Sequence, residues 1–519
     1  MRCLAVLAAL VCLSSAQAAE LRIGLAAPAT SMDPHFYNAS PNISVAMHVF
    51  DRLTHRSPDA KVIPWLAERW TAINDTTWEF KLRPGVTFHD GTLLTPDDIA
   101  FTVARVPAVP NSPGGFGGYL RAIASVETID ATTVRFHTKA PAPNLPGDLA
   151  TIAIIARHIG NGASTEDYNS GKAAIGTGPY RLVRYLAGDR VALVRNDAWW
   201  GGRPEWDRVT IRFITNPGSR TAALLAGDVD LIDVPPAADL PRLKADPMLS
   251  VFSIQGLRVI FLAPDFSREG AEPYVTDHDG HPLAANPLRD LRVRQALSAA
   301  INRSGIADRV MQGTAVATGQ WLPPGTFGYA PAVGVPSYNP DKAKALLAEA
   351  GYPLGFRVTL HTPNDRYPND AATAQAVAQM WTRIGVQTTV EALPWTAYSV
   401  RLNHQEFSIG LVGWGSNTAE AGYTLVNVIG SWDPASGRGA ANSGRYSNPM
   451  LDAVTDTALA TLDDGTRERR LIEAVGTAMA QLPIIPLHQL INYWAARQGI
   501  LYEPREDERS LAMNAHAVR

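Results

Sequence analysis

Strand-like and helix-like patterns alternate along nearly the whole chain, and this alternation most limits the folds that the chain can adopt. Residues 21–25 (LRIGL) have the apolar character of a buried strand. Thr95 is a predicted N-cap, and Pro96 follows it at the first position of a helix. Residues 220–226 form a second helical pattern that ends at Gly227. Strands that alternate with helices predict the α/β class, in which helices cover the faces of a sheet.

The length of 519 residues predicts two or more lobes, because a single hydrophobic core stops growing at about 250–300 residues. The composition changes near residues 255–290, where the apolar run LRVIFLA is followed by a polar loop and then by two helical patterns. The second of these has Asn339 as its cap and Pro340 at its first position. Near the end of the chain, LPIIPLHQLINYW has the pattern of a buried strand that returns to the first lobe.

Two further expectations concern the first 100 residues. Residues 43–53 read as a helix, because Val45, Val49 and Leu53 are spaced four apart. Residues 78–82 (WEFKL) and 86–91 (VTFHDG) read as two strands joined by the turn RPG.

The amino-terminal segment predicts export. Residues 1–18 combine one basic residue, an apolar run and a small-residue site ending at Ala18, which is the layout of a cleaved signal peptide. Cys12 is a poor lipid-anchor candidate, since a small residue does not precede it. Both cysteines, Cys3 and Cys12, lie in this segment, so the mature chain is expected to depend on packing without disulfides. No later apolar run reaches about 20 residues, so we expect a soluble mature protein.

Charge and motifs exclude several classes of function. The formal net charge is -3, which gives no basic surface for nucleic acid and no polybasic block for a membrane. The loop of residues 277–281 (DHDGH) mixes carboxylates and imidazoles, but Asp-Gly favours a turn over a metal site. Residues 170–173 (SGKA) lack the other residues of a phosphate loop. The sequence contains no nucleophile motif, although an enzyme with unmarked carboxylates stays open.

One stretch, VGWGSNTAEAGY (residues 412–423), has the composition of a ligand contact. It follows a strand-like run, and strand ends are where a sheet presents residues to a crevice. Trp414 has glycine on both sides, which allows a ligand to approach the backbone. For Trp199 and Trp200 we prefer ordinary packing.

Seven stretches, in the same order, resemble family 5 of the bacterial extracellular solute-binding proteins, a group that includes dipeptide, oligopeptide, nickel and glutathione binders of ABC importers. The stretches are PWLAERW (64–70), TWEFKLRPGVTFHDGTLLTPDDIAF (77–101), GTGPYRL (176–182), RNDAWWGGRPEWDRVTIRFI (195–214), ALLAGDVDL (223–231), LRDLRVRQALSAAINR (288–303) and YNPDKAKALLAEAGY (338–352). The resemblance implies the α/β, two-lobed periplasmic binding protein fold, with a hinge and an extra subdomain of about residues 60–170 on the first lobe. Lobe one would comprise residues 19–258 and 486–519, and lobe two residues 259–485.

The same resemblance implies a function without catalysis. A soluble periplasmic receptor would close its two lobes over a peptide or peptide-like solute and then dock on a membrane permease, while a cytoplasmic ATPase supplies the energy. No cofactor, metal or nucleic acid is expected, and the receptor would be a monomer. The alternatives are an opine-like compound, a metal chelate or a short oligosaccharide as solute, a sensor role, and a secreted hydrolase.

The resemblance also implies the binding residues. In peptide-binding relatives the third residue after the tryptophan of this stretch is commonly an Asp that pairs with the ligand's α-amino group. Here that residue is Asn417, so the solute would either lack a free α-amino group or find its counter-charge elsewhere, with Glu420 the nearest candidate. Arg366 is near the position of an arginine that binds the ligand carboxylate, with the spacing changed by about two residues. The complete predicted set is Trp414, Gly415, Ser416, Asn417, Glu420, Tyr423 and Arg366.

Overall fold

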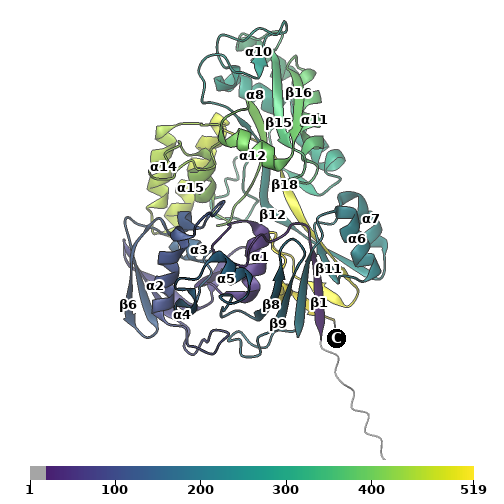
Figure 1. Cartoon of the computed structure of the whole chain (residues 1–519). Helices are drawn as coiled ribbons and strands as arrows, with labels where there is room; N and C mark the ends of the chain where they lie inside the picture. The colour runs from purple at the N-terminus through teal and green to yellow at the C-terminus, as the bar shows by residue number, and fades with distance from the viewer. Residues whose placement is uncertain (1–18, 519) are drawn as a thin grey trace, which may run out of the picture.

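The computed structural model describes residues 19–518, and a twelve-stranded mixed sheet is its central feature (Figure 1). Two long antiparallel strands, β12 and β18, lie in the middle of this sheet and pair along most of their length. The path across the sheet is β13 (Val275–Thr276), β15 (Arg357–Pro363), β17 (Ile409–Gly415), β12 (Leu249–Pro264), β18 (Ile485–Arg497), β11 (Leu231–Asp233), β1 (Glu20–Leu25), β10 (Arg208–Phe213), β9 (Arg190–Arg195) and β8 (Tyr180–Leu186). Off this path, β14 (Ala315–Ala317) pairs with β18, and β16 (Gln387–Leu393) pairs with β15.

The chain forms two lobes, one on each side of the pair β12–β18, which connects them in Figure 1. The first lobe has its main core around β1, β9 and β10. The second lobe has one core on each side of its strands, and the two cores share none of their buried residues. The predicted lobe boundaries at residues 258 and 486 fall inside β12 and β18, so each predicted boundary lies within a strand.

Three smaller sheets complete the strands. A four-stranded antiparallel sheet with its own core lies inside the range predicted for the extra subdomain. Its strands are β4 (Ala67–Asn74), β5 (Thr77–Leu82), β7 (Thr133–Thr138) and β6 (Ile123–Asp130). The two-stranded sheets are β2 (Thr54–Arg56) with β3 (Val62–Pro64), and β19 (Ile500–Tyr502) with β20 (Ala515–Ala517).

Helices begin and end largely where the local sequence predicts. Thr95 and Asp98 form a capping box at the start of the helix whose first residue is Pro96. Asn339 accepts from the Lys342 N–H, and Gly227 ends its helix with φ of 79°. The first-lobe helices are α1 (Ser40–Val49), α2 (Pro96–Arg105), α3 (Leu145–Leu149), α4 (Arg157–Gly160), α5 (Thr165–Asn169), α6 (Pro217–Ala226) and α7 (Leu240–Ala245). Those of the second lobe are α8 (Leu291–Ala299), α9 (Arg303–Gly305), α10 (Pro340–Glu349), α11 (Asp370–Thr382), α12 (Trp395–Asn403), α13 (Ala421–Thr424), α14 (Pro449–Leu459) and α15 (Asp464–Gln481).

A bulge interrupts β12 where it passes from one lobe to the other. The register with β18 shifts between Gln255 and Val259. A side chain at Gly256 would collide with the Asn492 amide, since an added Cβ would lie 2.6 Å from its oxygen. The Leu257 N–H is directed out of the sheet and donates to the Glu506 carbonyl at 3.0 Å. The bulge therefore turns residues 257 and 258 toward the carboxy-terminal segment of the first lobe.

Two local predictions are wrong in detail. Residues 86–91 are not a strand: the Phe88 N–H bonds the Thr92 carbonyl and Gly91 has φ of 90°, so the apolar side chains reach the subdomain core from a turn. The helix expected over residues 43–53 is Ser40–Val49, because the Val49 carbonyl accepts from Gly178 N–H at 3.0 Å and the chain becomes extended at Phe50.

The predicted turn at residues 277–281 is confirmed. Asp277 accepts from the N–H groups of Asp279 and His281 at 2.9 Å each, and Gly280 has φ of 92°. The carboxylates and the imidazole of Asp277, Asp279 and His281 have atoms within 4.8 Å of one another, but the Asp277 side chain is already used by the turn.

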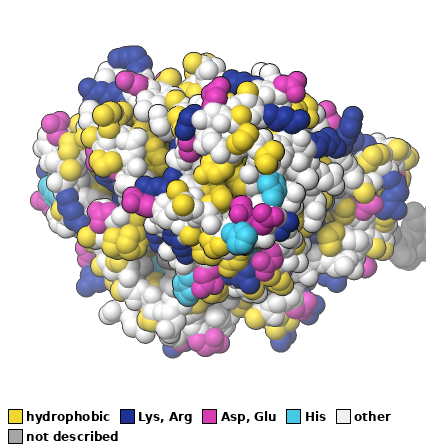
Figure 2. All heavy atoms as spheres, turned by 90° about the horizontal axis from the view of Figure 1, so that it is seen from above, with side chains coloured by type: hydrophobic (Ala, Val, Ile, Leu, Met, Phe, Trp, Pro, Cys, Tyr) yellow, Lys and Arg dark blue, Asp and Glu magenta, His cyan; other side chains and the backbone are white. Residues whose placement is uncertain are grey.

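The predicted signal peptide and both cysteines lie outside the described residues. Among the described helices, none combines the length and apolar character needed to cross a membrane. On the face at the top of Figure 1, acidic and basic side chains are interspersed (Figure 2).

Candidate functional site between the lobes

The segment of residues 414–423 leaves the sheet at the end of β17, beside the bulge of β12. Gly415 pairs with Arg258 and Trp414 with Val259 across the two strands. Because β12 continues into the first lobe, this register holds the beginning of the segment at the boundary between the lobes. The segment then returns through a turn to α13.

Three aromatic rings form a column that crosses from the second lobe to the first. Trp414 and Tyr423 are stacked at 5.3 Å between ring centroids, with an angle of 21° between planes. Tyr423 is stacked in turn on Tyr119 of the first lobe at 6.0 Å and 5°. Tyr423 packs against the subdomain core, and burial together with the neighbouring Tyr119 raises its pKa well above the usual value. The column is a rigid apolar contact between the lobes.

Asn417 makes the polar contact beside this column. Its Nδ2 donates to the Tyr119 hydroxyl at 2.9 Å and lies 3.5 Å from the Asn38 Oδ1. Asn38 also donates to the Tyr119 hydroxyl, at 3.2 Å, and the hydroxyls of Tyr119 and Tyr423 are 3.1 Å apart. The Tyr119 oxygen is thus the centre of a network in which every member is neutral.

Gly415 and Ser416 keep the segment close to the hinge. A Cβ at Gly415 would lie 3.3 Å from the Arg258 Nη2, so a larger residue would push against this guanidinium. Ser416 N–H donates to the Leu257 carbonyl at 3.4 Å, and its hydroxyl donates to the Glu420 carbonyl at 3.4 Å. Both Ser416 hydrogen bonds end on backbone carbonyls, so the segment lies close to the neighbouring backbone, and small residues fit there.

Glu420 has a partner of its own. Its side chain is buried, and its Oε2 lies 2.7 Å from Nη1 of Arg467 on α15. Burial raises the pKa of Glu420, while Arg467 opposes that change. A solute ammonium group at Glu420 would therefore have to compete with Arg467.

Arg366 lies before α11 with an exposed side chain. Its guanidinium is 5.4 Å from the ring centroids of both Tyr367 and Trp395, and it forms no ion pair among the described residues. Tyr398, by contrast, is fully buried and donates to the Leu411 carbonyl at 2.9 Å, so it packs within the second lobe.

The interpretation of the sequence missed the groups that the first lobe and the hinge contribute. Asn38 comes from a loop and Tyr119 from a short 3-10 helix, Gly117–Leu120, and neither has a recognisable motif. The Arg258 guanidinium bonds both carboxylate oxygens of Glu508, at 3.0 and 2.5 Å, and the Ser40 hydroxyl donates to the same carboxylate at 2.7 Å. Of these groups, Arg258 alone could have been noticed in the sequence, because it is a charged residue within the apolar run LRVIFLA.

A two-lobed α/β fold with a polar and aromatic contact at the lobe boundary defines the class of binding proteins that enclose a solute between lobes. The model of the family "Bacterial extracellular solute-binding proteins, family 5 Middle" matches residues 61–435. The chain belongs to this family, which confirms the predicted membership, the two-lobed fold and the prediction of a binding protein instead of an enzyme.

Known relatives cover nearly the whole chain. It is 30% identical to heme-binding protein A of Haemophilus influenzae over 90% of this chain and 85% of that one. It is 28% identical to the dipeptide-binding protein of Escherichia coli, with 78% and 77% covered. A periplasmic binding protein, DppA, from Helicobacter pylori in complex with the peptide STSA has the same fold, with a TM-score of 0.81, 22% identity, and 96% and 98% covered.

Proposed function

We propose that this protein is the periplasmic solute-binding component of an ABC importer and that it captures a peptide or peptide-like solute between its lobes. The observation that supports this most directly is the contact of Asn417 with Tyr119 and Asn38, because it is polar, neutral and made between lobes. Such contacts exist only when the lobes are closed, and a solute that adds to them shifts the equilibrium toward the closed form. The closed form then docks on a membrane permease served by a cytoplasmic ATPase.

The peptide class is favoured by relatives and by the residues at the site. One relative is a dipeptide-binding protein, and a protein of the same fold was solved in complex with a peptide. Arg366 is an exposed guanidinium without an ion-pair partner among the described residues, and a peptide carboxylate would supply one. Trp414 has a buried indole nitrogen without a hydrogen-bond partner in the described structure, so it is available to a solute carbonyl.

Asn417 sets a limit on the solute. A neutral amide offers an ammonium group a weaker bond than a carboxylate does, because only the carboxylate adds the attraction of an opposite charge to the hydrogen bond. Glu420 is held by Arg467, so it is a poor substitute. The solute would therefore carry a blocked or absent α-amino group, with Trp414, Gly415, Ser416, Asn417 and Tyr423 as its contacts and Glu420 as support for the segment.

The decisive experiment is native mass spectrometry of protein purified without denaturation, followed by calorimetry with matched free and N-acetylated di- and tripeptides. We expect the N-blocked peptides to bind more tightly, and Asn417→Asp to reverse this preference. Asn403→Asp, on the exposed side of α12, is the matched control and should leave the preference unchanged. The same preference in Asn417→Asp and in the parent would contradict the role of Asn417.

The same screen tests the other solutes and classes. Heme is included because one relative is a heme-binding protein, together with an opine, a metal chelate and an oligosaccharide. A solute recovered chemically changed would indicate a hydrolase and contradict the proposal. Mass spectrometry of the exported protein also tests cleavage after Ala18 and the expected monomer.

A further inference from the structure

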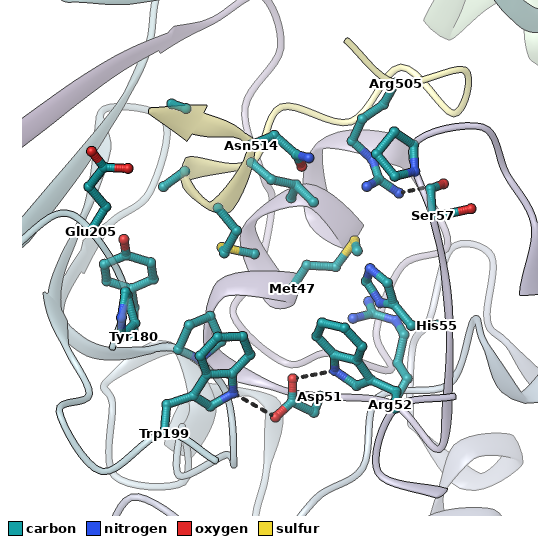
Figure 3. A pocket seen from close by; sticks show the side chains of 18 of the residues that line it. Met47, Asp51, Arg52, His55, Ser57, Tyr180, Trp199, Glu205, Arg505 and Asn514 are labelled. Carbon is teal, nitrogen blue, oxygen red and sulfur yellow. Dashed lines mark hydrogen bonds between the residues drawn. The ribbon is translucent and has the colours of Figure 1, made fainter. Parts of the chain in front are cut away.

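A separate cavity of about 420 Å³ lies within the first lobe (Figure 3). It is enclosed by the end of α1, β2 and β3, by the loop that carries Trp199, and by residues 511–516 of the carboxy-terminal segment. None of the seven predicted binding residues lines it. Its volume falls within the range of about 300–1,000 Å³ that is usual for small-molecule sites.

Most of the cavity wall is aromatic or apolar. Figure 3 shows Met47, Tyr180 and Trp199 around the space, with His55 on the opposite side. The His55 ring stacks on Trp65 at 4.2 Å with an angle of 20°. Burial, together with nearby arginines, lowers the pKa of His55 well below its usual value, so the imidazole is neutral. Flat, neutral walls of this kind favour a planar ligand.

The carboxylate of Asp51, also on the wall, accepts hydrogen bonds from four side chains of the protein. Its carboxylate accepts from the indole N–H groups of Trp65, Trp199 and Trp200 at 2.7, 3.3 and 2.9 Å, and from the Thr177 hydroxyl at 3.0 Å. Two of these bonds are drawn in Figure 3. Trp65 donates to Oδ1 and the other three donors share Oδ2, so Asp51 positions the tryptophans and most of its acceptor capacity is used within the protein.

The guanidinium of Arg52, the next residue, has few partners in the described structure. Only 2% of Arg52 is exposed, yet it forms no ion pair among the described residues, and the one hydrogen bond of its guanidinium there runs from Nη1 to the Phe50 carbonyl at 3.3 Å. The nearby Asp507 is held by Arg505 at 2.8 Å and by Arg509 at 3.3 Å. Burial is the main cause that lowers the pKa of Arg52, with repulsion from Arg509 next, while Asp51 and Asp507 oppose this change without forming an ion pair with Arg52. A buried cation without a paired anion is costly and is rarely left so.

From this combination we infer a second small-molecule site in the first lobe, which takes a planar aromatic monocarboxylate with its carboxylate on Arg52 and its ring among Trp65, Trp199 and Tyr180. A carboxylate would give Arg52 the paired hydrogen bonds that it lacks. The exposed groups at the rim are Arg203, Glu205 and His516, and Glu205 is bonded by the Ala517 N–H and by the His516 imidazole. The site is independent of the solute proposed for the cleft between the lobes.

The test is calorimetry of the full chain with 2-naphthoate and with the neutral, nearly isosteric 2-naphthamide, supported by tryptophan fluorescence. Naphthoate should bind and naphthamide should bind at least about tenfold more weakly, because the amide cannot form the charged pair. This comparison needs no variant. Equal affinity for both compounds, or no binding of naphthoate at millimolar concentration, would overturn the proposal.

Variants then locate the site. Arg52→Met should weaken naphthoate by about 10- to 100-fold and should leave the chain folded, since it removes an unpaired buried charge. Arg366→Met, at the site proposed between the lobes, and Arg69→Met, at an exposed position on β4, should leave the affinity within about twofold. Loss of binding in Arg366→Met with retention in Arg52→Met would assign the compound to the cleft and refute the first-lobe site. Circular dichroism and thermal unfolding confirm that each variant is folded.

Discussion

Asp51 in the first lobe and Asn417 in the second are both buried or half-buried polar side chains among aromatic rings, but their partners differ in origin. Asp51 receives all four of its hydrogen bonds from residues of its own lobe. The Asn417 amide donates its two side-chain hydrogen bonds to Tyr119 and Asn38, which both belong to the other lobe. Asp51 is therefore satisfied whether the lobes are open or closed, whereas Asn417 is satisfied by protein only when they are closed.

The comparison separates structural from functional polar groups. A charged group such as Asp51 needs permanent donors, because an unpaired buried carboxylate is very unfavourable. A neutral amide can exchange a tyrosine hydroxyl for water at small cost, so it suits a contact that must form and break.

Asp51→Ala should lower the free energy of unfolding by about 3–5 kcal/mol, because it leaves three indole N–H groups and one hydroxyl without their acceptor. Urea unfolding followed by tryptophan fluorescence measures this. Asp75→Ala, at an exposed turn, is the matched control and should change stability by less than about 0.5 kcal/mol. If both variants were equally stable, Asp51 would not be the structural group described above.

Arg258→Met should cost about 2 kcal/mol, because it leaves the Glu508 carboxylate partly buried with the Ser40 hydroxyl as its remaining side-chain donor. The pair is partly open to solvent, so we expect less than for a fully buried pair. Arg69→Met on β4 is the control, since Arg69 is exposed and forms no ion pair among the described residues. If Glu508→Gln and the double variant Arg258→Met/Glu508→Gln both lowered the free energy of unfolding as much as Arg258→Met does, the two side chains would act as one unit.

Glu272 extends the comparison to a buried acid of the second lobe. Burial, with the nearby Asp265, raises its pKa to about 7, although Ser408 donates to it and Arg268 lies 3.4 Å away. The folded state therefore binds more protons than the unfolded state between its usual pKa of 4.5 and about 7. Stability should fall as pH rises through that window, and Glu272→Gln should remove on the order of 1 kcal/mol of this fall. Urea unfolding at a series of pH values checks it, and parallel curves for variant and parent would contradict the assignment.

Tyr119→Phe should have the smallest effect on stability, about 0.5–1.5 kcal/mol, because the groups that lose the hydroxyl can bond water when the lobes open. Its main effect should be on the shape, with a shift toward the open form that small-angle scattering detects without solute. Tyr338→Phe, whose side chain is 43% exposed, is the control. An unchanged scattering profile would mean that the tyrosine hydroxyl does not hold the lobes together.

Much of the architecture follows from local sequence. Capping at Thr95 and Asn339 and the stop at Gly227 depend on bonds within a few residues, so they could be predicted. Residues 86–91 have strand-like residues but form a turn, because their apolar side chains are drawn into the subdomain core. The composition of residues 414–423 was enough to propose this segment as a ligand contact. It was not enough to predict which residues of the first lobe the segment contacts.

The α/β class, the turns and the caps could be predicted from the amino-acid order, since these follow from periodicity and from short-range hydrogen bonds, and the family from the resemblance of seven stretches. Which distant groups meet depends on the folding of the whole chain. Tyr119 and Asn417 are separated by 298 positions, Arg258 and Glu508 by 250, and neither pair leaves a local pattern. The same holds for Arg52: that its guanidinium forms no ion pair among residues 19–518 is a property of the packed lobe, because a charge in a sequence carries no sign of whether folding will provide its partner.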